Sequence, residues 1–294
     1  MLSGALLLQP SKLNESIRTF FKKRVKRIGV AFIFWSIIYL AWAFFISNTQ
    51  ITENNIIQGI LFSFFSGSYY HFWFIYLIFG LYLLTPILRA IVSCDSQKIL
   101  KYLITLWFIG VSIVPVIQLI SGYHLNDTLF VFGGTIGYFV LGLFLQKIKV
   151  RSSLLYGLFF SGIIFTIIST WLMRFQFYSI SQDYFFFDYL SVNVILTSVT
   201  LFMFLSKFPA DWPKDKHPIF RRLIHTISKN TLPIYLFHLI IMETLQRGYL
   251  GFKLSLTTMN PIIGVPVIAA VTLIVTLGLI IIMKKVPGLR KIIG

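Results

Sequence analysis

The chain alternates between long apolar runs and short polar, mostly basic segments. An α-helix needs about 20 predominantly apolar residues to cross a bilayer, and it satisfies its own backbone hydrogen bonds there. Eight runs reach or approach that length: residues 28–46, 72–92, 102–120, 129–145, 154–173, 189–205, 232–245 and 261–283. We therefore predict an all-α fold, a polytopic transmembrane helical bundle with eight full spans. The run 232–245 is the weakest of these, because it is short and carries His238 and Glu243.

A ninth apolar segment opens the chain and is too short to cross a membrane. Residues 1–8 read MLSGALLL, and Gln9-Pro10 ends the run. No basic segment precedes it and no small-residue cleavage site follows it, as a signal peptide would require. We interpret it as an N-terminal half-helix, and we expect the true start of the protein to lie upstream of Met1. A truncated gene copy is the alternative.

Composition excludes a soluble globular protein and gives the topology. Hydrophobic residues make up 57% of the 294 residues and charged residues only 12%, with a mean hydropathy of +0.83, which is too little polar surface to cover a soluble domain. All but three of the 26 Lys and Arg residues (Arg174, Arg247 and Lys253 are the three) fall on one side of the predicted spans. Basic loops mark the cytoplasmic side. The net charge of +17 is thus a topology signal rather than a nucleic-acid site, and both termini are predicted to be cytoplasmic.

Polar side chains at helical spacing mark three spans, and such residues are costly in lipid. They are His71, Tyr82, Thr85 and Arg89 along 72–92; Thr231, Tyr235 and His238 along 232–245; and Asn193, Thr197 and Thr200 along 189–205. We interpret His71, Tyr82, Arg89, Tyr235 and His238 as candidates to line a cavity. The alternatives are an aromatic-belt role for His71 and ordinary helix–helix hydrogen bonding for the Asn193 group.

The basic segment before the first span is a second candidate site. Arg24 and Arg27 are three residues apart, so on a helix they share a face and could clamp a phosphate. Attraction to anionic lipid head groups is the simpler explanation of the same charges. The sequence has no HExxH motif, no cysteine pair and no paired Asp motif, so we expect no metal centre, and it has no serine-hydrolase elbow.

Four segments together resemble the acyltransferase-3 family, integral-membrane enzymes that O-acylate bacterial surface glycans. They are MLSGALLL at the start, FFKKRVKRIGVAFIFW with the Arg24-x-x-Arg27 pair, SYYHFWFIYLIFGLYLLTPILRA at 68–90, and NTLPIYLFHLII at 230–241. Within the family, the helix at 68–90 is most similar to the enterobacterial-common-antigen O-acetyltransferase type. The family fold has ten helices, so 1–294 would be a single domain lacking the first helix and half of the second.

The resemblance implies a membrane O-acyltransferase of the bacterial cytoplasmic membrane. Its co-substrate would be acyl-CoA, most simply acetyl-CoA, bound by Arg24 and Arg27, and its acceptor a glycan or lipid-linked sugar. The histidine that the family uses as base lies in the first helix and has no counterpart here, so the catalytic residue stays unassigned. Two alternatives remain open: a carrier or flippase for a lipid-linked sugar, and a non-catalytic remnant or scaffold.

Overall fold

The structure is a computed structural model, and it describes residues 1–47, 57–60, 67–93, 97–122, 134–176, 185–208 and 218–294. Every regular element in these ranges is a helix, which confirms the predicted all-α class. The chain divides into two compact units, one made of residues 1–15 and 81–212 and the other of residues 16–80 and 213–294. We call them unit 1 and unit 2 and describe each by itself.

Helices occupy all eight predicted spans as far as these are described. Six are long and apolar enough to cross a membrane: Ile17–Ser47, Tyr70–Ser93, Lys98–Ser121, Ser152–Phe175, Phe185–Leu205 and Pro261–Met283. The remaining two are shorter, namely α8 (Ile136–Leu145) and α12 (Thr231–Arg247). The first part of the predicted span 129–145 lies outside the described residues.

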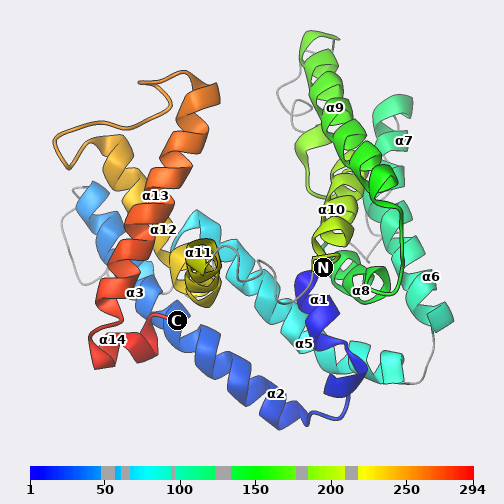
Figure 1. Ribbon diagram of the computed structural model, residues 1–294, viewed down its shortest axis with the longest axis horizontal. Coiled ribbons are helices and arrows are strands. Elements are labelled where there is room, and N and C mark those ends of the chain that lie inside the picture. Colours follow the sequence, from blue (N-terminus) through cyan, green and yellow to red (C-terminus); the bar gives the residue numbers. More distant parts are fainter. Residues whose placement is uncertain (48–56, 61–66, 94–96, 123–133, 177–184, 209–217) are drawn as a thin grey trace. The chain divides into compact units, whose positions relative to one another are not determined.

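Unit 1 contains α1 (Leu2–Leu7), α6 (Gln97–Phe108), α7 (Val114–Ser121), α8, α9 (Ser152–Gln176), α10 (Val192–Leu205) and the end of α5 (Trp73–Ser93). Helices α9 and α10 lie side by side, and α1 packs on α8 (Figure 1). Glycines make the second contact possible. A Cβ atom on Gly4 would lie 1.7 Å from the Phe139 carbonyl oxygen, and one on Gly142 would lie 2.0 Å from that of Met1.

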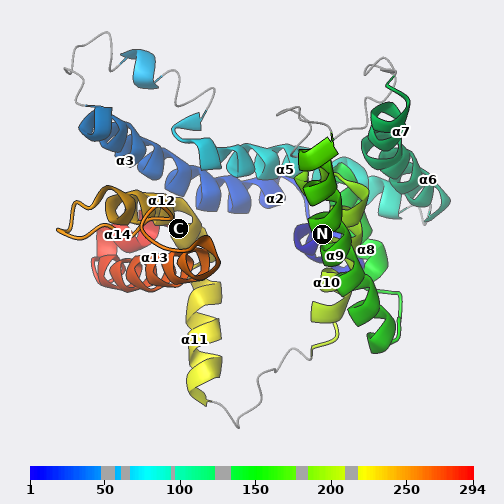
Figure 2. The same cartoon turned by 90° about the horizontal axis from the view of Figure 1, so that it is seen from above.

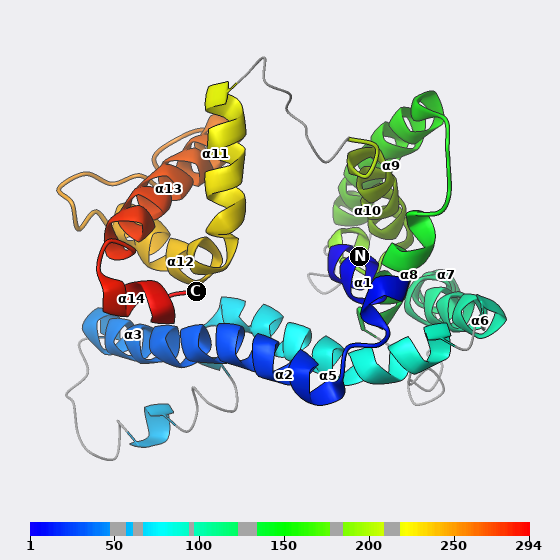
Figure 3. The same cartoon turned by 60° about the horizontal axis from the view of Figure 1, so that its bottom comes forward.

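Unit 2 contains α2 (Ile17–Arg24), α3 (Val30–Ser47), the start of α5, α11 (Pro218–Lys229), α12, α13 (Pro261–Met283) and α14 (Pro287–Ile292). Helices α12 and α13 run side by side (Figure 2), and α14 lies against α3 (Figure 3). Trp35, at 0% exposure, donates a hydrogen bond from Nε1 to the Ile293 carbonyl oxygen at 3.2 Å. This bond fixes the C-terminal segment on α3.

Two of the polar segments that separate the predicted spans are helical. Residues 17–24 form α2, which starts at Ser16, whose Oγ accepts a hydrogen bond from the Thr19 backbone amide at 3.3 Å. The π-helical turn Val25–Gly29 joins it to α3. Residues 218–229 form α11, with Ile219, Phe220 and Leu223 exposed on its apolar side.

Candidate active site

The site is built in unit 2 from a row of hydrogen-bonding aromatic residues on α3. Trp35, Tyr39 and Trp42 follow the i, i+4, i+7 spacing of one helix face. Tyr39, fully buried, donates from its hydroxyl to the Leu236 carbonyl oxygen of α12 at 2.9 Å. Trp42 donates from Nε1 to Oε2 of Glu243, also on α12, at 2.8 Å. The row therefore joins α3 to one side of α12.

His71 lies in the aromatic pocket beside this row. It belongs to the short 3₁₀ turn Tyr70–Phe72 that leads into α5, and only 6% of its surface is exposed. Ring centroids lie within 6 Å on several sides, with Phe72 at 4.7 Å, Tyr39 at 5.0 Å and Tyr235 at 5.5 Å. Neither ring nitrogen of His71 forms a hydrogen bond of good geometry within the described residues. A buried imidazole of this kind can still bond a ligand.

His238 completes a histidine pair with His71. The two ring centroids are 5.6 Å apart at an interplanar angle of 83°. Nδ1 of His238 lies 2.7 Å from the Tyr235 carbonyl oxygen. A carbonyl only accepts hydrogen bonds, so Nδ1 carries the proton and, in the neutral ring, Nε2 presents its lone pair. The Tyr235 hydroxyl in turn donates to the His71 carbonyl oxygen, which ties α12 to the turn that holds His71.

The carboxylate of Glu243 is the last polar group of the site, and it lies near the C-terminal end of α12. Glu243 accepts hydrogen bonds from the Trp42 indole and from the Tyr69 hydroxyl. Burial raises the pKa of the Tyr69 phenol, and the hydrogen bond to Glu243 raises it further. Tyr69 therefore stays protonated and acts as a donor. The arrangement gives Glu243 a fixed position about one turn beyond His238.

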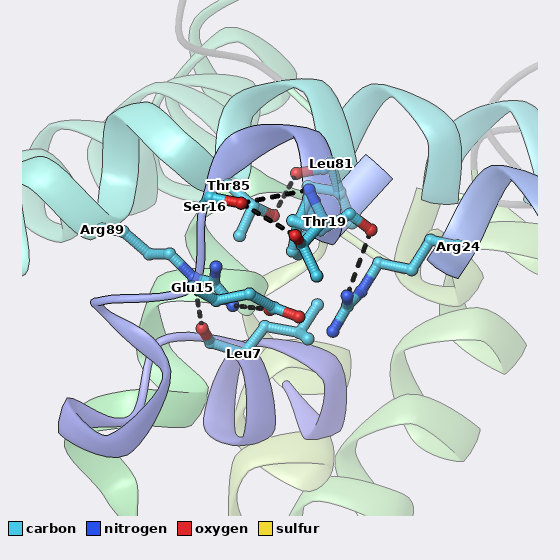
Figure 4. Close-up of polar contacts among 9 residues, drawn as sticks. Leu7, Glu15, Ser16, Thr19, Arg24, Leu81, Thr85 and Arg89 are labelled. Carbon is cyan, nitrogen blue, oxygen red and sulfur yellow. Dashed lines mark hydrogen bonds and ion pairs between the residues drawn. The ribbon is translucent and has the colours of Figure 1, made fainter. Parts of the chain in front are cut away.

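Of the cavity-lining candidates, the structure brings three together and leaves two elsewhere. His71, Tyr235 and His238 meet in unit 2. Tyr82 and Arg89 lie on the part of α5 that belongs to unit 1. Arg89 is 5% exposed and donates from Nε to the Leu7 carbonyl oxygen at 2.9 Å, with Nη2 3.3 Å from Oε2 of Glu15 (Figure 4). These contacts join α5 to the segment after α1.

The Asn193 group behaves as ordinary helix packing. Thr197 and Thr200 donate to the carbonyl oxygens of Asn193 and Leu196 one turn earlier, at 2.7 and 2.9 Å. The Asn193 amide donates to Thr166 Oγ1 of α9 at 2.6 Å. The simpler of the two interpretations is confirmed here.

Arg24 and Arg27 have different surroundings. The Arg24 guanidinium lies 4.0 Å from the centroid of the Phe20 ring and donates to the Phe20 carbonyl oxygen at 3.2 Å. Three α-helical steps leave two side chains about 60° apart, and the π turn that contains Arg27 widens that angle because it holds more residues per turn. The two arginines therefore share a face less closely than the spacing predicts.

Arg27 instead belongs to a group of cations that the sequence analysis did not identify. Partial burial lowers the pKa of the Lys284 ammonium, and the charges of Lys229, Arg27 and Arg290 lower it further. We call Arg27, Lys229, Lys284 and Arg290 the Lys284 cluster. Like charges held together stabilise a bound anion, so this cluster can hold phosphate groups.

Sequence reasoning also missed Tyr39, Trp42 and Tyr69. The sequence does contain a pattern that marks Tyr39 and Trp42: together with Trp35 they repeat at helical spacing, and each side chain carries a hydrogen-bond donor. The partners of these donors lie on α12 and α14, and one sequence does not show which helices pack together.

Comparison with known proteins gives a family match for almost the whole chain. The profile of the acyltransferase-3 family, described as an acyltransferase domain, matches residues 1–282. No curated protein and no solved structure matches the chain.

Proposed function

The chain belongs to the acyltransferase-3 family and is a membrane acyltransferase; from this premise we propose that it moves an acyl group from acyl-CoA to a hydroxyl of a cell-surface or lipid-linked glycan. The resemblance of residues 68–90 to O-acetyltransferases supports acetyl as one acyl group that the protein can transfer. The bacterial cytoplasmic membrane is the proposed location. The observation that carries the proposal is the histidine pair in its aromatic pocket, close to the one carboxylate of α12.

The cations of unit 2 support acyl-CoA as donor. The phosphates of CoA need positive charge, and guanidinium groups bind phosphate oxygens in pairs. Arg27 lies with three further cations in the Lys284 cluster, and Arg24 lies one helical turn earlier in the chain. We assign the CoA phosphates to Arg24, Arg27 and this cluster.

The histidine pair supports transfer to a hydroxyl. In the reaction, the hydroxyl oxygen forms a bond to the thioester carbonyl carbon, the carbon–sulfur bond breaks, and CoA leaves as a thiol after taking up a proton. A hydroxyl attacks poorly until a base takes its proton. His238 Nε2, whose lone pair is presented because Nδ1–H is held by Tyr235, can accept the hydrogen bond of the incoming hydroxyl. Aromatic rings around the pair suit the faces of a sugar.

The test is transfer of label from [¹⁴C]acetyl-CoA to glycan in membranes that contain the protein. We expect His238→Ala to reduce the rate about 100-fold, the size typical of a lost proton-transfer partner. His225→Ala is the matched control, because His225 is exposed on α11 and lies outside the site. Its rate should equal that of the wild type.

Other results would contradict the proposal. Equal rates for the two variants would remove His238 from the mechanism. If the wild-type protein moved a lipid-linked sugar across vesicles but transferred no label, the carrier hypothesis would replace acyl transfer. Insertion and yield of each variant are checked first, so that a folding defect is not mistaken for a lost function.

A further inference from the structure

A cavity of about 360 Å³ lies between α12 and α13, on the side of α12 that includes His238. Its wall is almost entirely apolar and includes Ile234 and Met242 of α12 and Ile268 and Ala269 of α13. All of its lining belongs to unit 2. The space is partly open, since Leu256 and Val265 in its wall are exposed, and its apolar lining suits a hydrocarbon chain better than a sugar.

Three polar side chains interrupt the apolar wall, namely His238, Gln246 and Thr272, and the first and last of them bear on the position of a ligand. His238 lines the cavity, and its Nε2 has no hydrogen-bond partner within the described residues. Thr272 also lines the cavity and is 5% exposed, and its hydroxyl has no partner among the described residues. A buried hydroxyl without a partner costs free energy unless a ligand or water satisfies it. The two groups therefore indicate where the polar end of a ligand would lie.

The Lys284 cluster lies at a distance that fits one particular ligand. Thr272 and Lys284 are separated by twelve helical steps along α13, which is about 18 Å at 1.5 Å per residue. The pantetheine arm of CoA has roughly 13 bonds between its phosphate and its sulfur, and fully extended it spans about 15 Å. Phosphates held by the cluster would therefore bring the thioester close to the level of Thr272 and His238.

We propose that the α12–α13 cavity is the binding site for the acyl chain of the donor, which the protein takes as a medium-chain acyl-CoA. This inference rests on the proposed function. The Thr272 hydroxyl donates a hydrogen bond to the thioester carbonyl oxygen, and the chain continues past Ala269 and Met242, away from Lys284. From Thr272 to Val265, at the far end of the cavity, α13 rises about 10 Å, the length of a chain of about eight carbons. An acetyl group would leave most of this space empty.

The test compares acetyl-CoA with octanoyl-CoA for binding to the full chain in lipid nanodiscs, with empty nanodiscs subtracted. Each methylene removed from water strengthens binding about fourfold, so we expect octanoyl-CoA to bind at least 100-fold more tightly than acetyl-CoA. Ala269→Phe fills the cavity and should weaken octanoyl-CoA binding at least tenfold, so that octanoyl-CoA loses most of its advantage over acetyl-CoA. Ala270→Phe is the matched control, because Ala270 is exposed and does not line the cavity.

A second variant covers the case in which Ala269→Phe fails to fold. Met242→Ala enlarges the cavity and should shift the preferred chain to a greater length. Equal binding of the two donors by the wild type, or equal effects of the two phenylalanine substitutions, would overturn the inference and show that membrane lipid fills the cavity instead. In that case acetyl-CoA would still bind and the proposed function would stand. If neither CoA ester bound, the proposed function would fall as well.

Discussion

Arg24 and Arg27 are three residues apart in the sequence but lie in different chemical surroundings. Arg24 is half-buried over the Phe20 ring, and its guanidinium also donates a hydrogen bond to the Phe20 carbonyl oxygen. Arg27 is exposed and close enough to Lys284 to lower the pKa of that ammonium. Arg24 would give up its contacts with an aromatic ring and a carbonyl oxygen on binding a phosphate. Arg27 would instead be relieved of repulsion from the neighbouring cations, because the phosphate neutralises their charge.

We therefore predict that Arg27→Ala weakens acyl-CoA binding more than Arg24→Ala does. A hydrogen bond to a charged group contributes about 1.5–3 kcal/mol, so Arg27→Ala should raise the dissociation constant about tenfold to 100-fold. Arg24→Ala should instead lower the melting temperature, because the Phe20 stack is lost. Titration calorimetry and a thermal scan of the same samples measure both effects, and equal dissociation constants for the two variants would contradict the prediction.

At the scale of single residues, the sequence predicted which side chains are unusual but not which of them meet. His71 and His238 were identified because a histidine in a membrane helix needs a partner. Their 5.6 Å contact depends on the Tyr235 and Tyr39 hydrogen bonds between helices. Arg89 lies on the same face of its predicted helix as His71. Its carboxylate partner, Glu15, is in the segment before α2, and the residue spacing within α5 cannot predict a partner in another segment.

At the scale of elements, helix α11 shows what a charge count conceals. Its residues lie in a segment between two predicted spans that is rich in lysine, arginine and proline. Apolar positions 219, 220, 223, 224 and 227 nevertheless repeat at helical spacing. With Ile219 85% exposed and Arg221 and Arg222 between the apolar positions, α11 has the features of a helix that lies in the membrane interface.

The long apolar spans, in contrast, were predicted well from the sequence. A chain that crosses lipid must satisfy its own backbone hydrogen bonds, and an α-helix is the only single segment that does so.

The contact of α1 with α8 depends on two glycines, which gives a prediction for this pair. Gly4→Ala would place Cβ 1.7 Å from the Phe139 carbonyl oxygen, so the helices must separate and lose part of their packing. Overpacking of this kind costs about 1–3 kcal/mol, and we expect a fall of several degrees in melting temperature. Gly157→Ala on α9 is the control, because its Cβ meets nothing within 4 Å. Equal melting temperatures would show that α1 does not pack there.

At the scale of the whole molecule, the distribution of charge predicts the topology. In the predicted topology, the lysines and arginines concentrate on one side of the spans, and the turn between α12 and α13, with Lys253, falls on the other side. Two of the eight predicted spans, α8 and α12, are shorter than the six other membrane helices. A short helix can cross when neighbouring helices or a thinner bilayer shorten the distance.

We predict opposite accessibility for two cysteines introduced in a Cys94→Ser background. Lys253→Cys, in the turn after α12, should react with a membrane-impermeant maleimide in intact cells. Ser206→Cys, directly after α10, should react only after the membrane is permeabilised, because the distribution of lysine and arginine predicts the cytoplasmic side for it. Labelling of both cysteines in intact cells would contradict the eight-span topology.

The Lys284 cluster also bears on how quickly a donor reaches the protein. Charges act in solution over a Debye length of about 8 Å at physiological ionic strength. The four cations of this cluster therefore attract a polyanion before any contact forms, and such steering raises encounter rates by about 10–10³. Donor capture should then slow steeply as salt is added, while departure of the spent CoA, governed by short-range contacts, should change little. At low donor concentration, turnover would be limited by arrival, so the ionic strength of the cytoplasm would set the rate of acyl transfer.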